Sequence, residues 1–395
     1  MTKANPSSNQ KIFFQNKLAV AGMLLILFTS LVAVLGYLIT PDGTPQANDM
    51  LVQLGLKKPG ASFTILRIKK QGQTDTVNVI GKMLFGQPSP WRNVPITHYR
   101  FNKDSIYIRE YIGDEDVAAE TAYNIYKISG KRSIAANPST QDTKKEVVKE
   151  ASPLAVQKKI TDQQIIKKTF WLGTDIYGRD MLSRLIIGAR ISLAVGFVSV
   201  LISLIVGVAV GSAAGYFGGK TDEFLSWLMN VLWALPALLL VIAISFALGK
   251  GLWQIFVAVG LSMWVEVGRL VRGQVIALKQ VEFIEAARAL GFGHYRIVRH
   301  HILPNITGPI LVLAASNFAS AILLEAGLSF LGYGAQPPTP TWGAMIKEHY
   351  GYIVIDSAYL AILPGLAIML IVYAFNVVTI GLRDAFDVKS QNTRV

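Results

Sequence analysis

The sequence ISLAVGFVSVLISLIVGVAVGSAA, at residues 191–214, carries no charged side chain. A bilayer core is about 30 Å thick and an α-helix rises about 1.5 Å per residue, so roughly 20 apolar residues in a row can cross it. This stretch therefore predicts a membrane-spanning helix. Uncharged runs of similar length are found at 18–39, 224–248, 306–324 and 358–382.

The composition agrees with several membrane crossings. Hydrophobic residues make up 52% of the 395 residues and charged residues only 16%, and the mean hydropathy is +0.41. Such a chain is too apolar for an ordinary soluble domain. A further apolar run at about 252–268 is shorter and carries Glu266 near one end, so it is either a tilted span or a re-entrant segment. We expect a span, which gives six crossings.

Basic residues set the expected orientation. The segment 1–17 contains Lys3, Lys11 and Lys17, and the segment 269–305 contains six basic side chains, namely Arg269, Arg272, Lys279, Arg288, Arg296 and Arg299. Such segments remain in the cytoplasm. Six crossings also return the tail at 383–395 to that side. We therefore expect a multi-pass protein of the inner (cytoplasmic) membrane with both termini cytoplasmic.

The formal net charge is +13. We attribute it to contact with anionic membrane lipid and cytoplasmic partners rather than to nucleic acid, because no basic patch with interleaved aromatic residues stands on a soluble fold. The chain contains no cysteine, so neither disulfides nor thiolate metal sites are expected. His300 and His301 are adjacent rather than three or four residues apart, which argues against a metal site.

A long segment, residues 40–168, separates the first two apolar runs and is expected to be exported. Alternating patterns at 76–79 and 105–109 predict β-hairpins within a β-rich unit at about 62–127. Residues 131–168 are lysine-rich with few large apolar side chains, which is typical of a polar linker or a solvated helix. Turn residues lie between the apolar runs, at Gln71-Gly72 and Asn102-Lys103-Asp104.

The segment EFIEAARALGFGHYRIVRHHILPN, at 282–305, lies in the basic gap before the next apolar run. Residues 281–291 can form a short helix on which Phe283, Ala287 and Leu290 share one side, at spacings of three and four residues. Gly291 can end that helix in a left-handed conformation. The pattern alone fits either an apolar docking surface or an amphipathic helix lying on lipid headgroups.

Several motifs together resemble a known family of transporters. Glu285, Ala286, Ala287 and Gly291, followed by Leu303-Pro304, resemble the EAA loop by which importer permeases of the ATP-binding cassette (ABC) class engage their ATPase subunits. Four further segments resemble the second-permease type of the dipeptide, oligopeptide and nickel importer family. They are LGTDIYGRDMLSR at 172–184, GLSFLG at 327–332, PPTPTWG at 337–343 and LRDAFD at 382–387.

The resemblance implies an all-α fold of the ABC type I importer permease kind, with a permease core at 169–382. It also implies a second homologous permease, two cytoplasmic ATPase subunits and an external solute-binding protein that delivers peptide. No cofactor and no catalytic residue are expected in this chain. The residues implied to contact an ATPase subunit are Phe283, Glu285, Ala286, Ala287, Leu290 and Gly291. The family's first external loop is generally much shorter, so nothing is carried over to residues 42–168.

Two other groups of residues receive structural assignments. We expect ion pairs that hold the segment before the second span, with no catalysis, formed by Asp175, Arg179, Asp180 and Arg184. Gly173 and Gly178 belong to the same segment. Pro337, Pro338 and Trp342 lie in the loop 325–357, which we expect to face the binding protein or to line the outer mouth of the pathway.

Two features leave alternatives open. A stripe of small residues in the second span indicates close helix packing, with a second permease as one candidate partner; it comprises Ser199, Ser203, Gly207, Gly211 and Ser212. The leading alternative function is an ion-coupled secondary transporter of a small solute. The absence of a charged residue in the middle of an apolar run weakens it, because such carriers usually need a titratable or cation-binding site.

Overall fold

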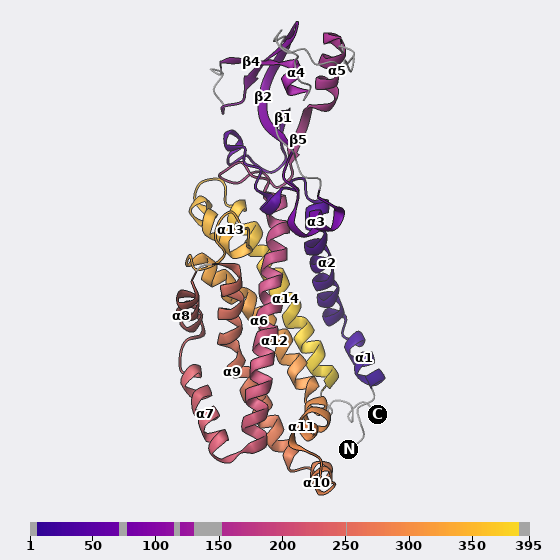
Figure 1. Ribbon diagram of the computed structural model, residues 1–395, viewed down its shortest axis with the longest axis vertical. Helices are drawn as coiled ribbons and strands as arrows, with labels where there is room; N and C mark the ends of the chain where they lie inside the picture. Colours follow the sequence, from indigo (N-terminus) through magenta and orange to yellow (C-terminus); the bar gives the residue numbers. More distant parts are fainter. Residues whose placement is uncertain (1–5, 71–76, 114–118, 130–151, 250, 387–395) are drawn as a thin grey trace, which may run out of the picture. The chain divides into compact units, whose positions relative to one another are not determined.

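The computed structural model describes residues 6–70, 77–113, 119–129, 152–249 and 251–386 (Figure 1). The chain divides into two compact units, one formed by Met1–Val34 with Ile187–Val395 and the other by Leu35–Ile186. Three regions discussed above lie outside the described residues. They are the turn expected at Gln71-Gly72, residues 131–151 of the expected linker and the tail beyond Phe386.

The first unit, called the permease unit here, is helical. Among the described residues, five helices are long and apolar enough to cross a membrane: α2 (Lys17–Ile39), α6 (Met181–Phe217), α9 (Leu252–Lys279), α12 (Thr307–Phe330) and α14 (Tyr359–Phe386). The shorter helices are α1 (Pro6–Gln15), α7 (Gly219–Trp233), α8 (Ala237–Leu248), α10 (Glu282–Ala289), α11 (His294–Ile297) and α13 (Trp342–His349). Single turns complete the unit at Val298–Ile302, Leu303–Asn305 and Tyr350–Ile353.

The apolar run at 224–248, which was expected to be one of the six spans, is interrupted. Helices α7 and α8 are bent by 97° at the break between them, so they form either a broken span or a re-entrant loop. Pro236 explains the break, because proline lacks a backbone N–H and disfavours helical geometry at the residue before it. By contrast, the shorter run at 252–268 continues without interruption into α9, a candidate span of 28 residues.

The small residues of α6 pack against α9 of the same chain. A Cβ added at Gly207 would lie 2.5 Å from the Cβ of Val267, and one added at Gly215 would lie 2.8 Å from the carbonyl oxygen of Arg272. The Ser199 hydroxyl donates a hydrogen bond to the Phe256 carbonyl at 3.1 Å. The stripe is therefore used for packing inside this chain.

The second unit, called the insert here, contains a five-stranded antiparallel sheet in the order β4-β3-β2-β1-β5. The strands are β1 (Ala61–Lys69), β2 (Trp91–Asn102), β3 (Ser105–Glu110), β4 (Glu120–Asn124) and β5 (Ile165–Phe170). Helices α3 (Val79–Phe85), α4 (Ile125–Ile128) and α5 (Pro153–Gln163) accompany the sheet, with short 3-10 turns at Pro45–Ala47 and Val52–Leu54.

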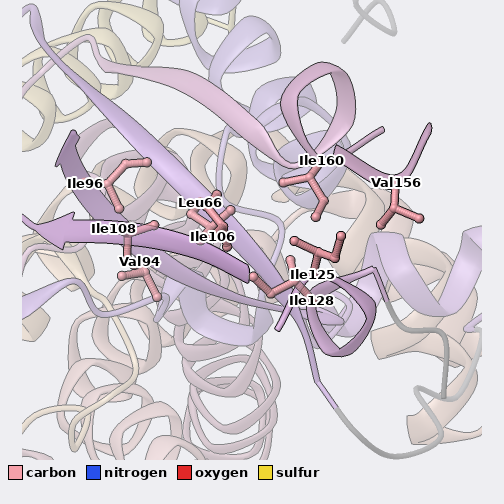
Figure 2. Packing of buried hydrophobic residues seen from close by; sticks show 9 residues of the cluster. All are labelled: Leu66, Val94, Ile96, Ile106, Ile108, Ile125, Ile128, Val156 and Ile160. Atoms are coloured by element: carbon pink, nitrogen blue, oxygen red, sulfur yellow. The ribbon is translucent and has the colours of Figure 1, made fainter. Parts of the chain in front are cut away.

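One face of the sheet carries a hydrophobic core (Figure 2). Successive side chains of a strand point to opposite faces, so Leu66 and Val94, which are paired across β1 and β2, lie on the same side. Strand β3 adds Ile106 and Ile108, and helices α4 and α5 cover them with Ile125, Ile128, Val156 and Ile160. All of these side chains are at most 4% exposed.

The structure confirms the turn at residues 102–104, because Asn102 pairs with Ser105 across a two-residue loop. The strand expected at 76–79 was wrong in its described part, since the Asn78 side chain accepts a hydrogen bond from the Gly81 N–H and caps α3. Of the two alternatives for residues 131–168, the solvated helix is confirmed at 153–163, which form α5. Residues 165–168 were expected in neither a strand nor a sheet, but they form most of β5, which pairs with β1.

A buried polar cluster precedes α6. The Asp175 carboxylate accepts hydrogen bonds from the backbone N–H groups of Tyr177 and Arg179, both at 2.9 Å. It also accepts from the Arg179 Nε at 2.5 Å and lies 3.5 Å from the Arg184 Nε. Asp175, Arg179 and Arg184 are at most 1% exposed. This cluster is therefore a buried structural element rather than a surface ion pair.

Glycines allow the chain to fold around this cluster. Gly173 and Gly178 have positive φ values of 75° and 71°, which L-residues rarely adopt. A Cβ at Gly178 would overlap the carbonyl oxygen of Leu51. Asp180 accepts hydrogen bonds from the Ser183 N–H at 2.9 Å and from the Ser183 hydroxyl.

Burial raises the pKa of Asp180 above its ordinary value, although the bonds from Ser183 favour the charged form. The folded insert therefore binds this proton more tightly than the unfolded chain does. The stability that the neutral carboxyl contributes is fully present below the ordinary aspartate pKa, about 4, and is lost as the pH rises through the raised value.

We predict that Ile106→Ala lowers the local stability of the insert by about 2–5 kcal/mol, because it removes buried methyl groups and leaves a cavity. Hydrogen exchange of the β2 and β3 amides, followed by mass spectrometry, measures this loss. Ile112→Ala is the matched control, since Ile112 is 53% exposed. Equal protection in the two variants would contradict the assigned core.

For Asp180→Asn, we predict that the variant gains stability relative to the natural chain as the pH rises through the raised pKa of Asp180. Thermal unfolding of the insert, measured from pH 4 upward, tests this difference. Asp162→Asn, on an exposed position of α5, controls for the loss of one carboxylate. Parallel curves for Asp180→Asn and the natural chain would refute the assignment.

Candidate functional site

Helix α10 continues directly from α9. Only Gln280 and Val281 separate the end of α9 at Lys279 from the start of α10 at Glu282. Ile284 and Ala287 of α10 are buried together with a group of apolar side chains from α6, α9 and the following turns, including Tyr216, Val267, Val271, Val275, Ile297 and Ile302. The position of α10 is thus fixed by the ends of the long helices.

The C-terminus of α10 has a complete glycine cap. Gly291 has a φ of 77° and its N–H donates to the Arg288 carbonyl, while the Phe292 N–H donates to the Ala287 carbonyl at 3.1 Å. These two bonds form a Schellman motif. A Cβ at Gly291 would meet nothing within 4 Å, so glycine is needed there for its backbone conformation and not for space. The expected left-handed helix end is confirmed.

The outward face of α10 differs from the expected one. Ala287 is only 4% exposed and points into the protein, whereas Phe283 and Leu290 are 40% and 74% exposed. Ala286 is exposed between them, at spacings of three and four residues, and Tyr295 of α11 is 71% exposed. We call Phe283, Ala286, Leu290 and Tyr295 the α10 face. Glu285 was expected at the contact and is also exposed.

Basic and aromatic side chains connect this region to the rest of the permease unit. The Tyr216 hydroxyl, near the end of α6, forms a hydrogen bond of 2.9 Å with the Nδ1 of His294. The Arg288 guanidinium lies 5.6 Å from the centre of the Tyr216 ring, within range of a cation–π interaction. Helices α10 and α11 are therefore tied to α6 as well as to α9.

A second ion pair fixes the turn between α6 and α7. Arg272 of α9 donates to both oxygens of the Asp222 carboxylate, from Nε at 2.5 Å and from Nη2 at 2.6 Å. This two-point contact holds the beginning of α7 on α9. Only Gly218 separates the end of α6 at Phe217 from the beginning of α7 at Gly219.

The residues expected in the outer loop are not all available at the surface. Pro337 is exposed, but Trp342 is 3% exposed, and its backbone N–H donates to the Ser192 hydroxyl at 3.2 Å. Trp342 begins α13 and packs against Gly188. The Trp342 indole is therefore not at the surface of this chain.

Sequence reasoning missed Glu325. It was placed in an external loop, but it lies inside α12 and is fully buried. The carboxylate accepts hydrogen bonds from the Ser329 hydroxyl at 2.7 Å and the Ser192 hydroxyl at 3.4 Å. The spacing of four residues between Glu325 and Ser329 was a local signal for this pair, since such residues share a helix face. The contact with Ser192 of α6 had no local signal.

Three groups of residues predicted from the sequence thus occupy separate places. The ATPase-contact residues lie together on or beside α10, although Ala287 is turned inward. The residues at 173–184 form the buried cluster of the insert. Among the outer-loop residues, Pro337 and Pro338 precede α13 and Trp342 begins it.

Comparison with known proteins gives consistent matches. Residues 207–391 match the family of binding-protein-dependent transport system inner membrane components, and residues 11–59 match the N-terminal transmembrane domain of oligopeptide transport permease C. The chain is 44% identical over 222 residues to the dipeptide transport system permease protein DppC of Alkalihalophilus pseudofirmus, a match that covers 56% of this chain and 73% of that protein.

The comparisons also include a second curated permease and a solved transporter structure. The glutathione transport system permease protein GsiD of Pectobacterium atrosepticum is 44% identical over 219 residues, which cover 55% of this chain and 72% of that protein. A chain of the inward-facing MetNI methionine ABC transporter is 23% identical and aligns with 51% of this chain and 97% of its own length. Its TM-score of 0.41 is too low to carry an argument.

The coverage and identity of these matches exceed what a shared membrane composition alone would produce. The family matches include the N-terminal span, the end of α6, the whole of α9, α12 and α14, and the segment that contains α10. The chain is therefore a membrane transport subunit rather than an enzyme, and it belongs to the DppC/OppC-like permeases of the binding-protein-dependent ABC transporter family.

Proposed function

We propose that this chain forms part of the translocation pathway of an ATP-driven importer of short peptides. Its partners are a second homologous permease, two cytoplasmic ATPase subunits and an external solute-binding protein. Family membership supports this assembly. The names of these relatives, which refer to dipeptide and glutathione transport, support a short peptide as the substrate.

The observation that carries the proposal is the exposed α10 face. Phe283, Leu290 and Tyr295 expose large apolar surface on a helix whose opposite side is buried. Exposed apolar surface with a polar rim is typical of protein interaction sites. Aromatic side chains in particular serve as anchors when a partner buries them. We infer that an ATPase subunit receives this face.

The acidic residues of α10 favour a protein groove over lipid headgroups. Glu282 and Glu285 are exposed in the first turn of the helix. The positive end of the helix dipole stabilises their negative charges, but an anionic membrane surface would repel them. An amphipathic helix that lies on such a membrane is usually basic along its polar face.

A movement of α10 can be transmitted to the membrane helices through direct contacts. The buried contacts of Ile284 and Ala287 connect α10 to α9, and the Tyr216–His294 bond connects α11 to α6. Since α6 and α9 are packed closely at their glycines, a force on α10 moves them together. Closure of the ATPase pair upon ATP binding would then rock the two permeases between inward-open and outward-open states.

The orientation follows from the same proposal. The α10 segment and both termini are placed on the cytoplasmic side, in agreement with the basic residues of 1–17 and 269–305. The insert is then exported, because it lies after the first span. The segment 331–357, which follows α12, is also placed on the external side, with Pro337 among its exposed residues.

An ion-coupled secondary transporter remains the second candidate function. Glu325 is the buried carboxyl that such a carrier would need, but the hydroxyls of Ser192 and Ser329 already bind it. Transport by an importer permease requires its ATPase subunits and ATP. A secondary carrier, in contrast, transports in response to an ion gradient alone.

We predict that Leu290→Asp lowers the amount of ATPase subunit that co-purifies with the detergent-solubilised chain by roughly tenfold or more, because it places a charge in the centre of an apolar contact. Gly291→Asp is expected to act in the same direction through the strained helix end. Quantitative immunoblotting of the co-purified subunit, together with ATP hydrolysis, measures the effect.

Leu154→Asp is the matched control for this experiment. Leu154 of α5 is 77% exposed, almost the same as Leu290 at 74%, but it belongs to the insert. It should leave ATPase binding unchanged. The coupling proposal fails if Leu290→Asp retains the natural amount of ATPase, or if the natural chain binds none in the presence of its importer subunits.

A further inference from the structure

The insert contains a cavity of about 390 Å³. It lies on the face of the sheet opposite the hydrophobic core. Arg67 of β1 and Asn93 of β2 are paired across the strands, as are their neighbours Leu66 and Val94, which belong to the core. Because successive side chains alternate between faces, Arg67 and Asn93 point to the cavity side.

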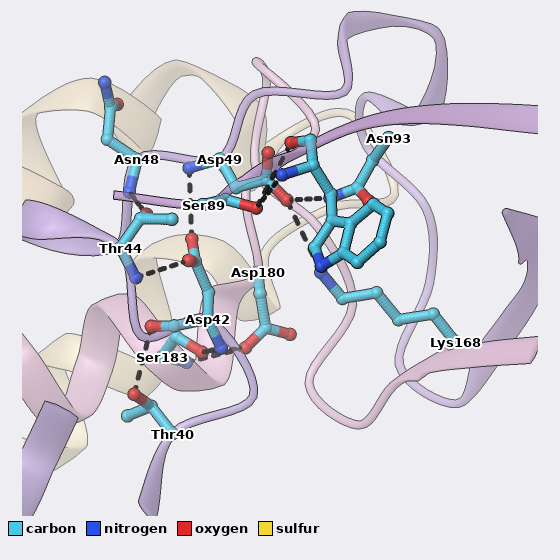
Figure 3. Close-up of polar contacts among 11 residues, drawn as sticks. Thr40, Asp42, Thr44, Asn48, Asp49, Ser89, Asn93, Lys168, Asp180 and Ser183 are labelled. Carbon is cyan, nitrogen blue, oxygen red and sulfur yellow. Dashed lines mark hydrogen bonds and ion pairs between the residues drawn. The ribbon is translucent and has the colours of Figure 1, made fainter. Parts of the chain in front are cut away.

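The two carboxylates of the cavity wall are already engaged (Figure 3). Asp42 accepts hydrogen bonds from the N–H groups of Thr44 at 2.9 Å and Asp49 at 3.0 Å. Asp49 accepts from the Asn93 Nδ2 at 2.7 Å and lies 3.9 Å from the Lys168 Nζ. Both acids therefore organise the wall and do not offer a free cation site.

Two basic side chains in the same cavity have no such partner. Arg67 and Lys82 line the cavity and are half-buried. Within the described residues, neither their guanidinium nor their ammonium group has a hydrogen bond or ion pair. Among the described residues that line the cavity, three cations, Arg67, Lys82 and Lys168, face two carboxylates, Asp42 and Asp49, which gives these residues a net charge of +1. The cavity is thus suited to a ligand with a single negative charge.

Asn93 offers a hydrogen-bond acceptor beside these cations. The Asp49 carboxylate can only accept, so the Asn93 amide must direct its Nδ2 toward Asp49. This orientation leaves the Asn93 Oδ1 buried and without a partner. A buried acceptor of this kind gains from an N–H donor. The cavity therefore favours a ligand that carries an N–H group near its anionic group.

The remaining wall is partly apolar. Ile65 and Ile166 are paired across β1 and β5, and both line the cavity with Trp91 and Pro88. Such a surface can take an aliphatic side chain. The combined requirements are a monoanion, a neighbouring N–H donor and a small apolar group. The C-terminal residue of a short peptide has all three.

We propose that the insert binds the C-terminal residue of a short peptide. Its carboxylate pairs with Arg67 and Lys82, its amide N–H donates to the Asn93 Oδ1, and its side chain contacts the half-buried Ile166 and Trp91. Arginine is suited to this contact because its planar guanidinium matches a carboxylate. A phosphate dianion fits less well, since Asp42 and Asp49 would repel its second charge. The proposal is independent of ATPase docking at α10.

The test is isothermal titration of the full-length, detergent-solubilised chain with the tripeptide Gly-Gly-Leu and with its C-terminal amide. We expect the free acid to bind at least tenfold more tightly than the amide. Lys82→Met and Arg67→Met should each weaken binding of the acid by tenfold or more. Lys158→Met is the matched control, because Lys158 is exposed on α5, outside the cavity, and it should bind as the natural chain does.

Three results would overturn the proposal. The first is equal affinity for the acid and the amide, and the second is natural affinity in Lys82→Met. The third is tighter binding of inorganic phosphate than of the tripeptide, with the same loss in Lys82→Met. Hydrogen exchange of β1 and β2 establishes that the variants are folded. If the peptide bound elsewhere in the translocation pathway, Lys82→Met and Arg67→Met would not change its affinity. The natural affinity of Lys82→Met, which is the second result, would then be observed.

Discussion

The close contact between α6 and α9 is the constraint on which the permease unit depends. At Gly207, Gly211 and Gly215 the α9 backbone or its β-branched side chains occupy the space of a Cβ. Any larger residue would push the two helices apart. Lipid provides no hydrophobic force that would drive such helices together, so close van der Waals packing and hydrogen bonds must hold them. The position of α9 in turn fixes α10, which begins only three residues after α9 ends.

The two units use different physical means to present a surface. In the permease unit, buried residues on one side of α10 hold it in place, so that the α10 face stays outward without a partner. In the insert, the larger hydrophobic core lies on one side of the sheet, and the other side combines a second buried apolar cluster, which includes Ile65 and Phe170, with polar residues around the cavity. Leu66 and Val94 stabilise the fold, while the neighbouring Arg67 and Asn93 line the cavity. The alternation of a β-strand thus places Leu66 and Val94 in this core and their neighbours Arg67 and Asn93 on the cavity side.

Local sequence patterns predicted a large part of this structure. The errors arose where contacts between residues far apart in the sequence determine the structure. Uninterrupted apolar length located the long helices, but it missed the bend at Pro236. Alternation located β3, whereas lysine-rich β5 is a strand because it pairs with β1, about a hundred residues earlier in the sequence. Helical spacing placed Phe283 and Leu290 correctly at the surface but could not tell that Ala287 packs inward. The burial of Glu325 depends on Ser192, which lies in a different helix.

The most direct test of the coupling function uses the absence of cysteine from the chain. Leu290→Cys introduces a single thiol on the α10 face, to which a benzophenone maleimide can be attached in the assembled importer. Illumination should then cross-link the chain to an ATPase subunit, and the yield should change when ATP is added. The same label at Leu154→Cys should give no such product. Cross-links from Leu290→Cys to lipid alone would contradict the assignment of α10 as the ATPase contact.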